Sequence, residues 1–178
     1  KILDKENNKK LDEIDKLSDL LTVIANHDSP RKKTARNFVL NDGNIESKLM
    51  IVSEAPGREE DEQGKPFVGE VGKLLNKMLS AINLERKNIY ITNLIPWRHP
   101  QDKIPKDEEI LEYMPYLQRQ IEIVKPAFIY LLGSTAAKAI LSTPIQLDRL
   151  RGRWHKYKSI NMNTSINVLV SHHPIFLL

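Results

Sequence analysis

The chain has 178 residues, of which 40% are hydrophobic and 28% are charged, and its formal net charge is +4 at pH 7. These values are typical of one soluble globular domain, and no apolar run approaches the roughly 20 residues that a membrane-spanning helix needs. The chain contains no cysteine, which excludes disulfides, thiolate nucleophiles and any zinc or iron–sulfur site with cysteine ligands from this chain.

The N-terminal residues and the charge also bear on location and partners. Residues 1–16 are rich in lysine and lack the apolar core of a signal peptide, so we expect a cytoplasmic protein that does not enter a membrane. The excess of basic residues favours contact with a polyanion, because lysine and arginine near phosphates release condensed counterions. Many basic proteins bind no nucleic acid, so charge alone leaves this question open.

The first predicted element is an amphipathic helix over residues 4–25. Its apolar residues recur mainly every three or four positions, which places them on one helical face. These residues are Leu11, Ile14, Leu17, Leu20, Leu21 and Ile24. We expect residues 1–25 to form an N-terminal helix packed on a single domain that comprises residues 26–178.

The rest of the chain alternates between predicted strands and helices. Short apolar runs predict four strands, over residues 49–52, 88–94, 127–132 and 168–171. Apolar spacing predicts helices over residues 71–82, 107–124 and 135–141, and Pro115 should kink or split the second of these. This alternation predicts an α/β fold, a three-layer α/β/α arrangement with a central four-stranded parallel sheet.

Polar residues stand at the ends of three predicted strands. Glu54 follows the first strand, Asn93 lies in the second near its end, and His173 follows the fourth. Ligands of open parallel sheets bind outside the carboxyl ends of the strands, so a carboxylate, an amide and an imidazole should converge on one rim. Taken singly, a turn, a capping asparagine and a surface histidine are equally good or better explanations. The joint arrangement favours a functional site.

At these residues the sequence resembles the family 4, or thermophile-type, uracil-DNA glycosylases. The matching motifs are, in order, residues 54–57, 60–61, 64–69, 92–93, 97–98, 150–152 and 173–174. The resemblance covers roughly residues 26–178, and the stretch from residue 54 to residue 69 is its most specific part. It implies a DNA repair enzyme that flips uracil out of DNA and hydrolyses its N-glycosidic bond, leaving an abasic site.

The resemblance also implies which residues bind the base. Phe67 would stack on uracil, using its aromatic face as a platform. Asn93 would bind the 3-NH and O4 of uracil, because an amide offers an acceptor and a donor side by side. Cytosine presents the opposite pattern and would leave buried groups unpaired. Ala55 would contribute a backbone N–H.

Three further residues are implied in catalysis. His173 would donate a hydrogen bond to uracil O2, where negative charge grows as the glycosidic bond breaks. Glu54 and Glu60 would lie near the sugar, where a carboxylate can orient water or favour an oxocarbenium-like deoxyribose. We assign the larger part of this catalytic role to Glu54.

Contacts to DNA are expected from two groups of residues. The segment after His173 resembles the apolar wedge that fills the space vacated in the duplex, and its residues are Pro174, Ile175 and Phe176. The alternative for this segment is packing into the core. Basic loop residues are candidates for phosphate contacts, although such residues are often merely solvated. They are Arg98, Arg151 and Arg153.

Many members of this family carry a four-iron, four-sulfur cluster, and this chain departs from that pattern. The ligating cysteines would align near Asn26, Ser29, Trp97 and Tyr113, none of which can replace a thiolate. We therefore expect no cofactor and no metal site, with the bulky Trp97 and Tyr113 filling the space by packing. Ser53 also stands where the family usually has glycine and could narrow the floor of the pocket.

Three alternatives remain beside a monofunctional uracil-DNA glycosylase that acts as a monomer on uracil-containing DNA. The first is a glycosylase for another deaminated base, such as hypoxanthine. The second is a DNA-binding relative that has lost catalysis, which would not need Glu54, Phe67, Asn93 and His173 together. The third is a nucleotide-binding α/β protein, for which the chain lacks a Gly-rich phosphate loop.

Overall fold

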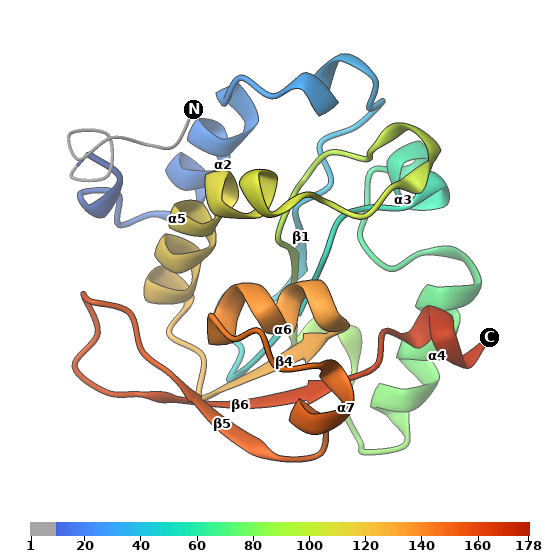
Figure 1. Ribbon diagram of the computed structural model, residues 1–178, viewed down its shortest axis with the longest axis vertical. Helices are drawn as coiled ribbons and strands as arrows, with labels where there is room; N and C mark the ends of the chain where they lie inside the picture. The colour runs from blue at the N-terminus through green and yellow to red at the C-terminus, as the bar shows by residue number, and fades with distance from the viewer. Residues whose placement is uncertain (1–9) are drawn as a thin grey trace.

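A six-stranded sheet in the order β1-β3-β2-β4-β6-β5 forms the centre of the computed structural model (Figure 1). The structure describes residues 10–178. Its strands are β1 (Asn41–Gly43), β2 (Leu49–Ser53), β3 (Tyr90–Asn93), β4 (Phe128–Leu132), β5 (Trp154–Tyr157) and β6 (Ile166–Ser171). The four inner strands β3, β2, β4 and β6 run parallel, which confirms the predicted central sheet.

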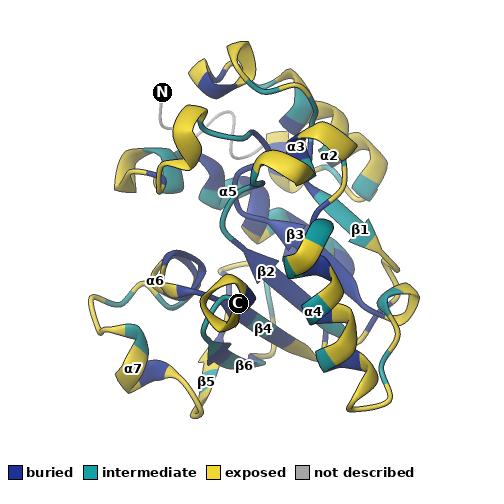
Figure 2. Ribbon diagram, turned by 90° about the vertical axis from the view of Figure 1, so that its right-hand side faces the viewer, coloured by how far each residue is buried: buried dark blue, intermediate teal, exposed yellow. Residues whose placement is uncertain are grey.

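The sheet has helices on both faces, so the three-layer α/β/α fold is also confirmed. One face is covered by α2 (Leu17–Asn26), α5 (Asp107–Val124) and α6 (Ser134–Leu141), and the other by α4 (Gly69–Ser80). Because side chains alternate along a strand, Met50 and Val52 of β2 pack towards the first layer while Ile51 packs towards α4. Both faces are apolar, and Figure 2 shows the inner strands as the most buried part of the molecule.

Shorter helices connect these elements. They are η1 (Pro30–Lys33), α3 (Arg58–Gln63), η2 (Arg86–Asn88), η3 (Pro100–Asp102), α7 (Leu147–Leu150) and η4 (Pro174–Leu177). The last of them lies beside α4 at the end of the chain (Figure 1). Among residues 10–178, no helix combines the length and the apolar character needed to cross a bilayer.

The N-terminal helix differs from the prediction. Residues 4–9 of the predicted helix lie outside the described residues, and in the remainder a helical turn at residues 10–12 is separated from α2 by residues 13–16. Arg119 of α5 explains the break, because its Nε donates to the Ile14 carbonyl oxygen at 2.9 Å and its Nη2 to Asp15 at 3.0 Å. The carbonyl that a continuous helix would use internally is therefore bound by another helix.

Two further differences concern Pro115 and the sheet edges. α5 continues through Pro115 as one helix, so the proline does not split the helix in two. The antiparallel strands β1 and β5 were not predicted. β1 has only three residues, Asn-Asp-Gly, and β5 is Trp-His-Lys-Tyr with two polar residues at its centre, so neither shows the apolar run that marks an inner strand.

Candidate active site

The carboxyl ends of the parallel strands form one rim, on which the predicted polar residues meet. Ser53 at the end of β2 is paired in register with Asn93 at the end of β3, and Leu132 of β4 with Ser171 of β6. His173 follows β6 by two residues, and its Nε2 lies 3.2 Å from the Ser53 hydroxyl oxygen. The structure therefore brings His173 next to the segment that carries Glu54.

His173 is held by contacts on both ring nitrogens and on the ring face. The Ile175 N–H donates to its Nδ1 at 3.2 Å, while Nε2 faces Ser53. The ring lies against Phe67, with centroids 5.5 Å apart and planes inclined by 21°. Burial lowers the pKa of His173 to about 4, because desolvation disfavours the imidazolium. The imidazole is therefore neutral near pH 7.

Phe67 is buried, with 2% of its surface exposed, and has an unusual backbone conformation. Its φ of 52° lies in the left-handed region, which costs a bulky residue roughly 1–3 kcal/mol unless the surroundings impose it. Gly72 of α4 makes this conformation possible, since a Cβ there would lie 2.0 Å from the Phe67 carbonyl oxygen. Strained residues of this kind are concentrated at functional sites.

Glu60 holds the loop that connects β2 to Phe67. One carboxylate oxygen accepts from the Gly57 N–H at 2.7 Å, and the other accepts from the Phe67 N–H. Burial raises the pKa of Glu60, although the two backbone donors oppose this shift. Both carboxylate oxygens thus accept from backbone donors, and in this structure Glu60 holds the loop in place.

Glu54 and Ala55 lie nearer the open side of the rim. Both are partly exposed, and the Glu54 carbonyl oxygen accepts from the Ile95 N–H at 2.9 Å. The Glu54 carboxylate makes no side-chain hydrogen bond or ion pair within residues 10–178. Of the two predicted carboxylates, Glu54 is the one that remains available to water or a sugar.

Asn93 is buried and oriented by the segment before β1. Its Nδ2 donates to the Val39 carbonyl oxygen at 3.0 Å, and its backbone N–H donates to the Leu40 carbonyl oxygen at 2.7 Å. One amide N–H is used in this way, which leaves the second N–H and Oδ1 to face a ligand. An amide fixed by the backbone can discriminate between donor and acceptor patterns.

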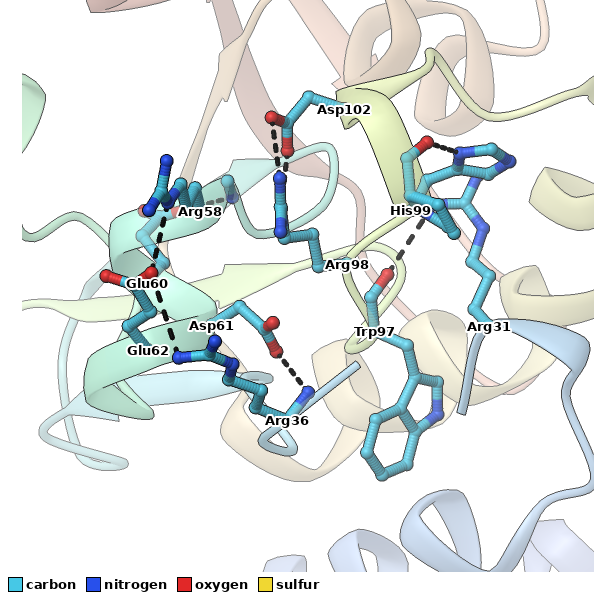
Figure 3. Close-up of polar contacts among 12 residues, drawn as sticks. Arg31, Arg36, Arg58, Glu60, Asp61, Glu62, Trp97, Arg98, His99 and Asp102 are labelled. Atoms are coloured by element: carbon cyan, nitrogen blue, oxygen red, sulfur yellow. Dashed lines mark hydrogen bonds and ion pairs between the residues drawn. The ribbon is translucent and has the colours of Figure 1, made fainter. Parts of the chain in front are cut away.

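The predicted DNA contacts are at the surface. Arg98 forms a two-pronged ion pair with Asp102, at 2.7 and 3.0 Å, Arg151 lies 3.4 Å from Asp148, and Arg153 is exposed. Two further arginines, which the sequence analysis did not name as candidates for phosphate contacts, lie in the same region as Arg98 (Figure 3). These are Arg36 and Arg58, whose guanidinium groups lie 3.8 and 3.0 Å from Glu62.

The segment after His173 is largely exposed. Pro174 is buried, but 55% of Ile175 and 75% of Phe176 are accessible. The described structure therefore does not bury Ile175 and Phe176 in the core, which was the alternative to a wedge. His172 points elsewhere, with its Nε2 3.6 Å from Asp148 of α7.

The residues at the expected cluster positions do not fit an iron–sulfur cluster. Trp97 and Tyr113 are buried in the hydrophobic core, where Trp97 packs edge-on against Phe38 and Tyr113 against His27, with centroids 5.2 and 5.5 Å apart. Ser29 is also buried, and none of these side chains is a thiolate. Within residues 10–178, no three His, Asp or Glu side chains are grouped so as to hold a metal ion.

A surface cavity of about 600 Å³ lies away from the rim, and its lining includes Arg119, Glu122 and Asn163. These residues precede β4 and β6, so the cavity is at the amino ends of the strands. Glu54, Phe67, Asn93 and His173 are absent from its lining, so this cavity is separate from the candidate active site.

Comparison with known proteins identifies a consistent set of relatives. Residues 40–178 match the family model described as the Uracil DNA glycosylase superfamily. A "Type-4 uracil-DNA glycosylase" of Archaeoglobus fulgidus is 37% identical over 150 residues, covering 82% of this chain and 74% of the relative. Relatives of the same name from Pyrobaculum aerophilum and Thermotoga maritima are 35% identical over 167 residues and 34% identical over 143 residues. These cover 91% and 80% of this chain, and 84% and 72% of the relatives.

Proposed function

The chain belongs to the uracil-DNA glycosylase superfamily, and from this premise we propose that it is a monofunctional DNA glycosylase that releases uracil from DNA and leaves an abasic site. The observation that carries the proposal is the neutral His173 beside Phe67 on the rim that also holds Glu54 and Asn93. A protein that only binds DNA does not need these four groups together. All of them come from one chain, which supports a monomeric enzyme.

Base recognition is assigned to Phe67 and Asn93. Uracil flipped out of the stack lies against the Phe67 ring. The Asn93 Oδ1 accepts from the uracil 3-NH, and its free Nδ2–H donates to O4. The other Nδ2–H is already bound to Val39, so the amide cannot turn over to match cytosine without losing that bond. Selectivity thus comes from an orientation that the protein has already fixed.

Bond breakage is assigned to His173 and Glu54. As the bond from the sugar C1′ to uracil N1 breaks, its electron pair passes to the base, and the His173 Nε2–H donates to the growing charge on O2. Such a donor contributes about 3 kcal/mol to transition-state stabilisation. Water orientated by the Glu54 carboxylate adds its oxygen to C1′ and loses a proton to solvent. The only lysine in the matching motifs is Lys65, beside Pro66 in a polar loop, and we assign no Schiff base to the reaction.

The direct test is incubation with an oligonucleotide that contains a single uracil, followed by alkali to cleave abasic sites. We expect strand cleavage at the uracil position and none with cytosine or thymine there. A parallel substrate that contains hypoxanthine tests the alternative that the enzyme releases another deaminated base. Absence of cleavage with uracil at stoichiometric enzyme would refute the proposal.

The Asn93 assignment has its own test. Asn93→Ala should lower single-turnover uracil excision by at least about a hundredfold, because a site built to hydrogen-bond a base loses its selection when one partner is removed. Asn93→Asp should weaken uracil excision and admit cytosine, whose exocyclic amine can donate to a carboxylate. Uracil excision by Asn93→Ala at the wild-type rate would show that the base is read elsewhere.

A further inference from the structure

We propose that Arg86, orientated by Asp42, is a positioning residue that fixes the Phe67 ring as the platform for the base. This inference rests on the proposed function and names a residue that the motifs of the sequence do not contain. Arg86 lies in η2, between α4 and β3, and touches neither His173 nor Asn93. Its hydrogen bonds reach the site through the backbone around Phe67.

All three guanidinium nitrogens of Arg86 donate hydrogen bonds that hold this arrangement. Nη1 donates to the Phe67 carbonyl oxygen at 2.7 Å, Nη2 donates to the Pro66 carbonyl oxygen, and Nε donates to the Asp42 carboxylate at 2.7 Å. The side chain is only 22% exposed. Two neighbouring carbonyl groups and a carboxylate match the fixed fork of a guanidinium, and a lysine ammonium cannot reproduce these three directions.

The backbone at Phe67 needs such support, because its φ of 52° is unfavourable for a bulky residue. The peptide groups on both sides of Phe67 are held. Glu60 accepts from its N–H, and Arg86 donates to its carbonyl oxygen. The Arg86 charge also acts on the Glu60 carboxylate. The left-handed conformation is thus fixed from two directions, and the ring direction follows from it.

Asp42 connects this support to the other base-reading residue. It lies in β1, two residues after Leu40, and the carbonyl oxygens of Leu40 and its neighbour Val39 are the ones that hold Asn93. One short segment, residues 39–42, therefore orients Asn93 at one end and Arg86 at the other. The ring that stacks and the amide that reads the base edge share one scaffold, which keeps their relative geometry constant.

The experiment compares Arg86→Gln with Lys87→Gln, an exposed neighbour whose ion pair within residues 10–178 is with Glu85. Arg86→Gln should lower the single-turnover excision rate between about tenfold and a hundredfold, since small misplacement of a binding group has effects of this size. Affinity for abasic DNA should change less than about threefold, because phosphate contacts carry most of it. Lys87→Gln should match the wild type in both measurements.

A double-mutant cycle separates positioning from a general structural role. If Arg86 acts through Phe67, Arg86→Gln should cost little further activity in a Phe67→Ala background. An equal loss in both backgrounds would overturn the proposal, as would a wild-type rate for Arg86→Gln. Asp42→Asn keeps the size of the side chain and replaces Arg86→Gln in the cycle if that variant does not fold. Asp42→Asn should likewise cost little further activity in the Phe67→Ala background.

A readout without activity keeps the two proposals separate. The chain has four phenylalanines, so fluorine NMR of protein labelled with para-fluorophenylalanine can resolve Phe67 by comparison with Phe67→Leu. Arg86→Gln should broaden or shift that resonance, and Lys87→Gln should not. If the resonance responds while the wild type excises no uracil, the proposed function fails and the positioning stands. If uracil is excised but the resonance and the rate are unchanged, the positioning fails alone.

Discussion

His173 carries its ring proton on Nε2, because its Nδ1 accepts the Ile175 N–H. Burial keeps the ring neutral near pH 7. A neutral imidazole donates a hydrogen bond to a growing anion without surrendering its proton beforehand. The contact with Ser53 shows that Nε2 already points to the rim, so the donor needs little reorganisation when charge develops.

His173→Ala should therefore lower the single-turnover excision rate on the order of a hundredfold or more, by analogy with the loss of one oxyanion donor. Binding to abasic DNA should change much less, because the charge that His173 meets exists mainly in the transition state. His172→Ala is the matched control, since His172 faces Asp148 and not Phe67. Equal and modest losses in both variants would make His173 a structural residue.

The same imidazole predicts a dependence of stability on pH. The folded state holds the pKa of His173 at about 4, whereas an unfolded histidine titrates near pH 6.5, so the unfolded chain binds more protons between these values. Stability therefore falls as the pH drops from 7 towards 4. Relative to His173→Gln, the free energy of unfolding of the wild type should decrease by up to about 2 kcal/mol from pH 7 to pH 5. Urea denaturation at both pH values measures this, and parallel pH profiles would contradict it.

At the scale of elements, α4 begins in an unusual way, because Gly72 admits the Phe67 carbonyl oxygen where any other residue would place a Cβ. A glycine inside an otherwise apolar helical stripe is a signal that sequence reasoning could have used. Replacing a helical glycine with alanine normally stabilises a protein by about 0.5–1 kcal/mol. At Gly72 the Phe67 carbonyl oxygen is so close that the same substitution should destabilise the protein.

Gly72→Ala should lower the free energy of unfolding by about 1–3 kcal/mol, the usual cost of overpacking, and should reduce uracil excision by displacing Phe67. Thermal and urea unfolding measure the first effect and single-turnover kinetics the second. Asn76→Ala, at an exposed position of the same helix, should be neutral or slightly stabilising. A more stable and fully active Gly72→Ala protein would show that the loop can move away without consequence.

The inner strands and the main helices were predictable because their apolar periodicity reports burial directly. β1 was not, because Asn41–Gly43 is stabilised by pairing with β3 and by the Asp42–Arg86 ion pair, neither of which leaves a local pattern. The division between Glu54 and Glu60 was also only partly predictable. Both are acidic residues in one motif, and only their hydrogen-bond partners separate them.

At the scale of the whole molecule, charged side chains link the N-terminal segment to α5. Arg31 is 3% exposed, forms a two-pronged ion pair with Glu109 at 2.5 and 3.0 Å, and reaches the Trp97 carbonyl oxygen at 3.5 Å. His27 lies 2.7 Å from Glu112. The sequence shows directly that no cysteine can join these segments. It does not show the contacts that hold them together, because the partners, such as Arg31 and Glu109, are about 80 residues apart along the chain.

Arg31→Ala should lower the free energy of unfolding by about 2 kcal/mol, less than for a fully buried pair because Glu109 can be partly hydrated. The excision rate per folded molecule should stay within about twofold of the wild type, since Arg31 contacts none of the rim residues. Arg58→Ala, which breaks an exposed pair with Glu62, should change stability by less than about 1 kcal/mol. Equal effects of both variants on stability would show that the Arg31 pair is no stronger than a surface pair.

The two antiparallel edge strands have a consequence for how molecules of this protein meet. β1 offers only three residues, with the charged Asp42 and with Gly43 at a φ of 93°, and β5 has four residues that include the exposed Lys156. Short, charged and irregular edges are poor templates for a strand from another molecule. Aggregates formed on heating should therefore grow from unfolded chains, and the native sheet itself should resist edge-to-edge association.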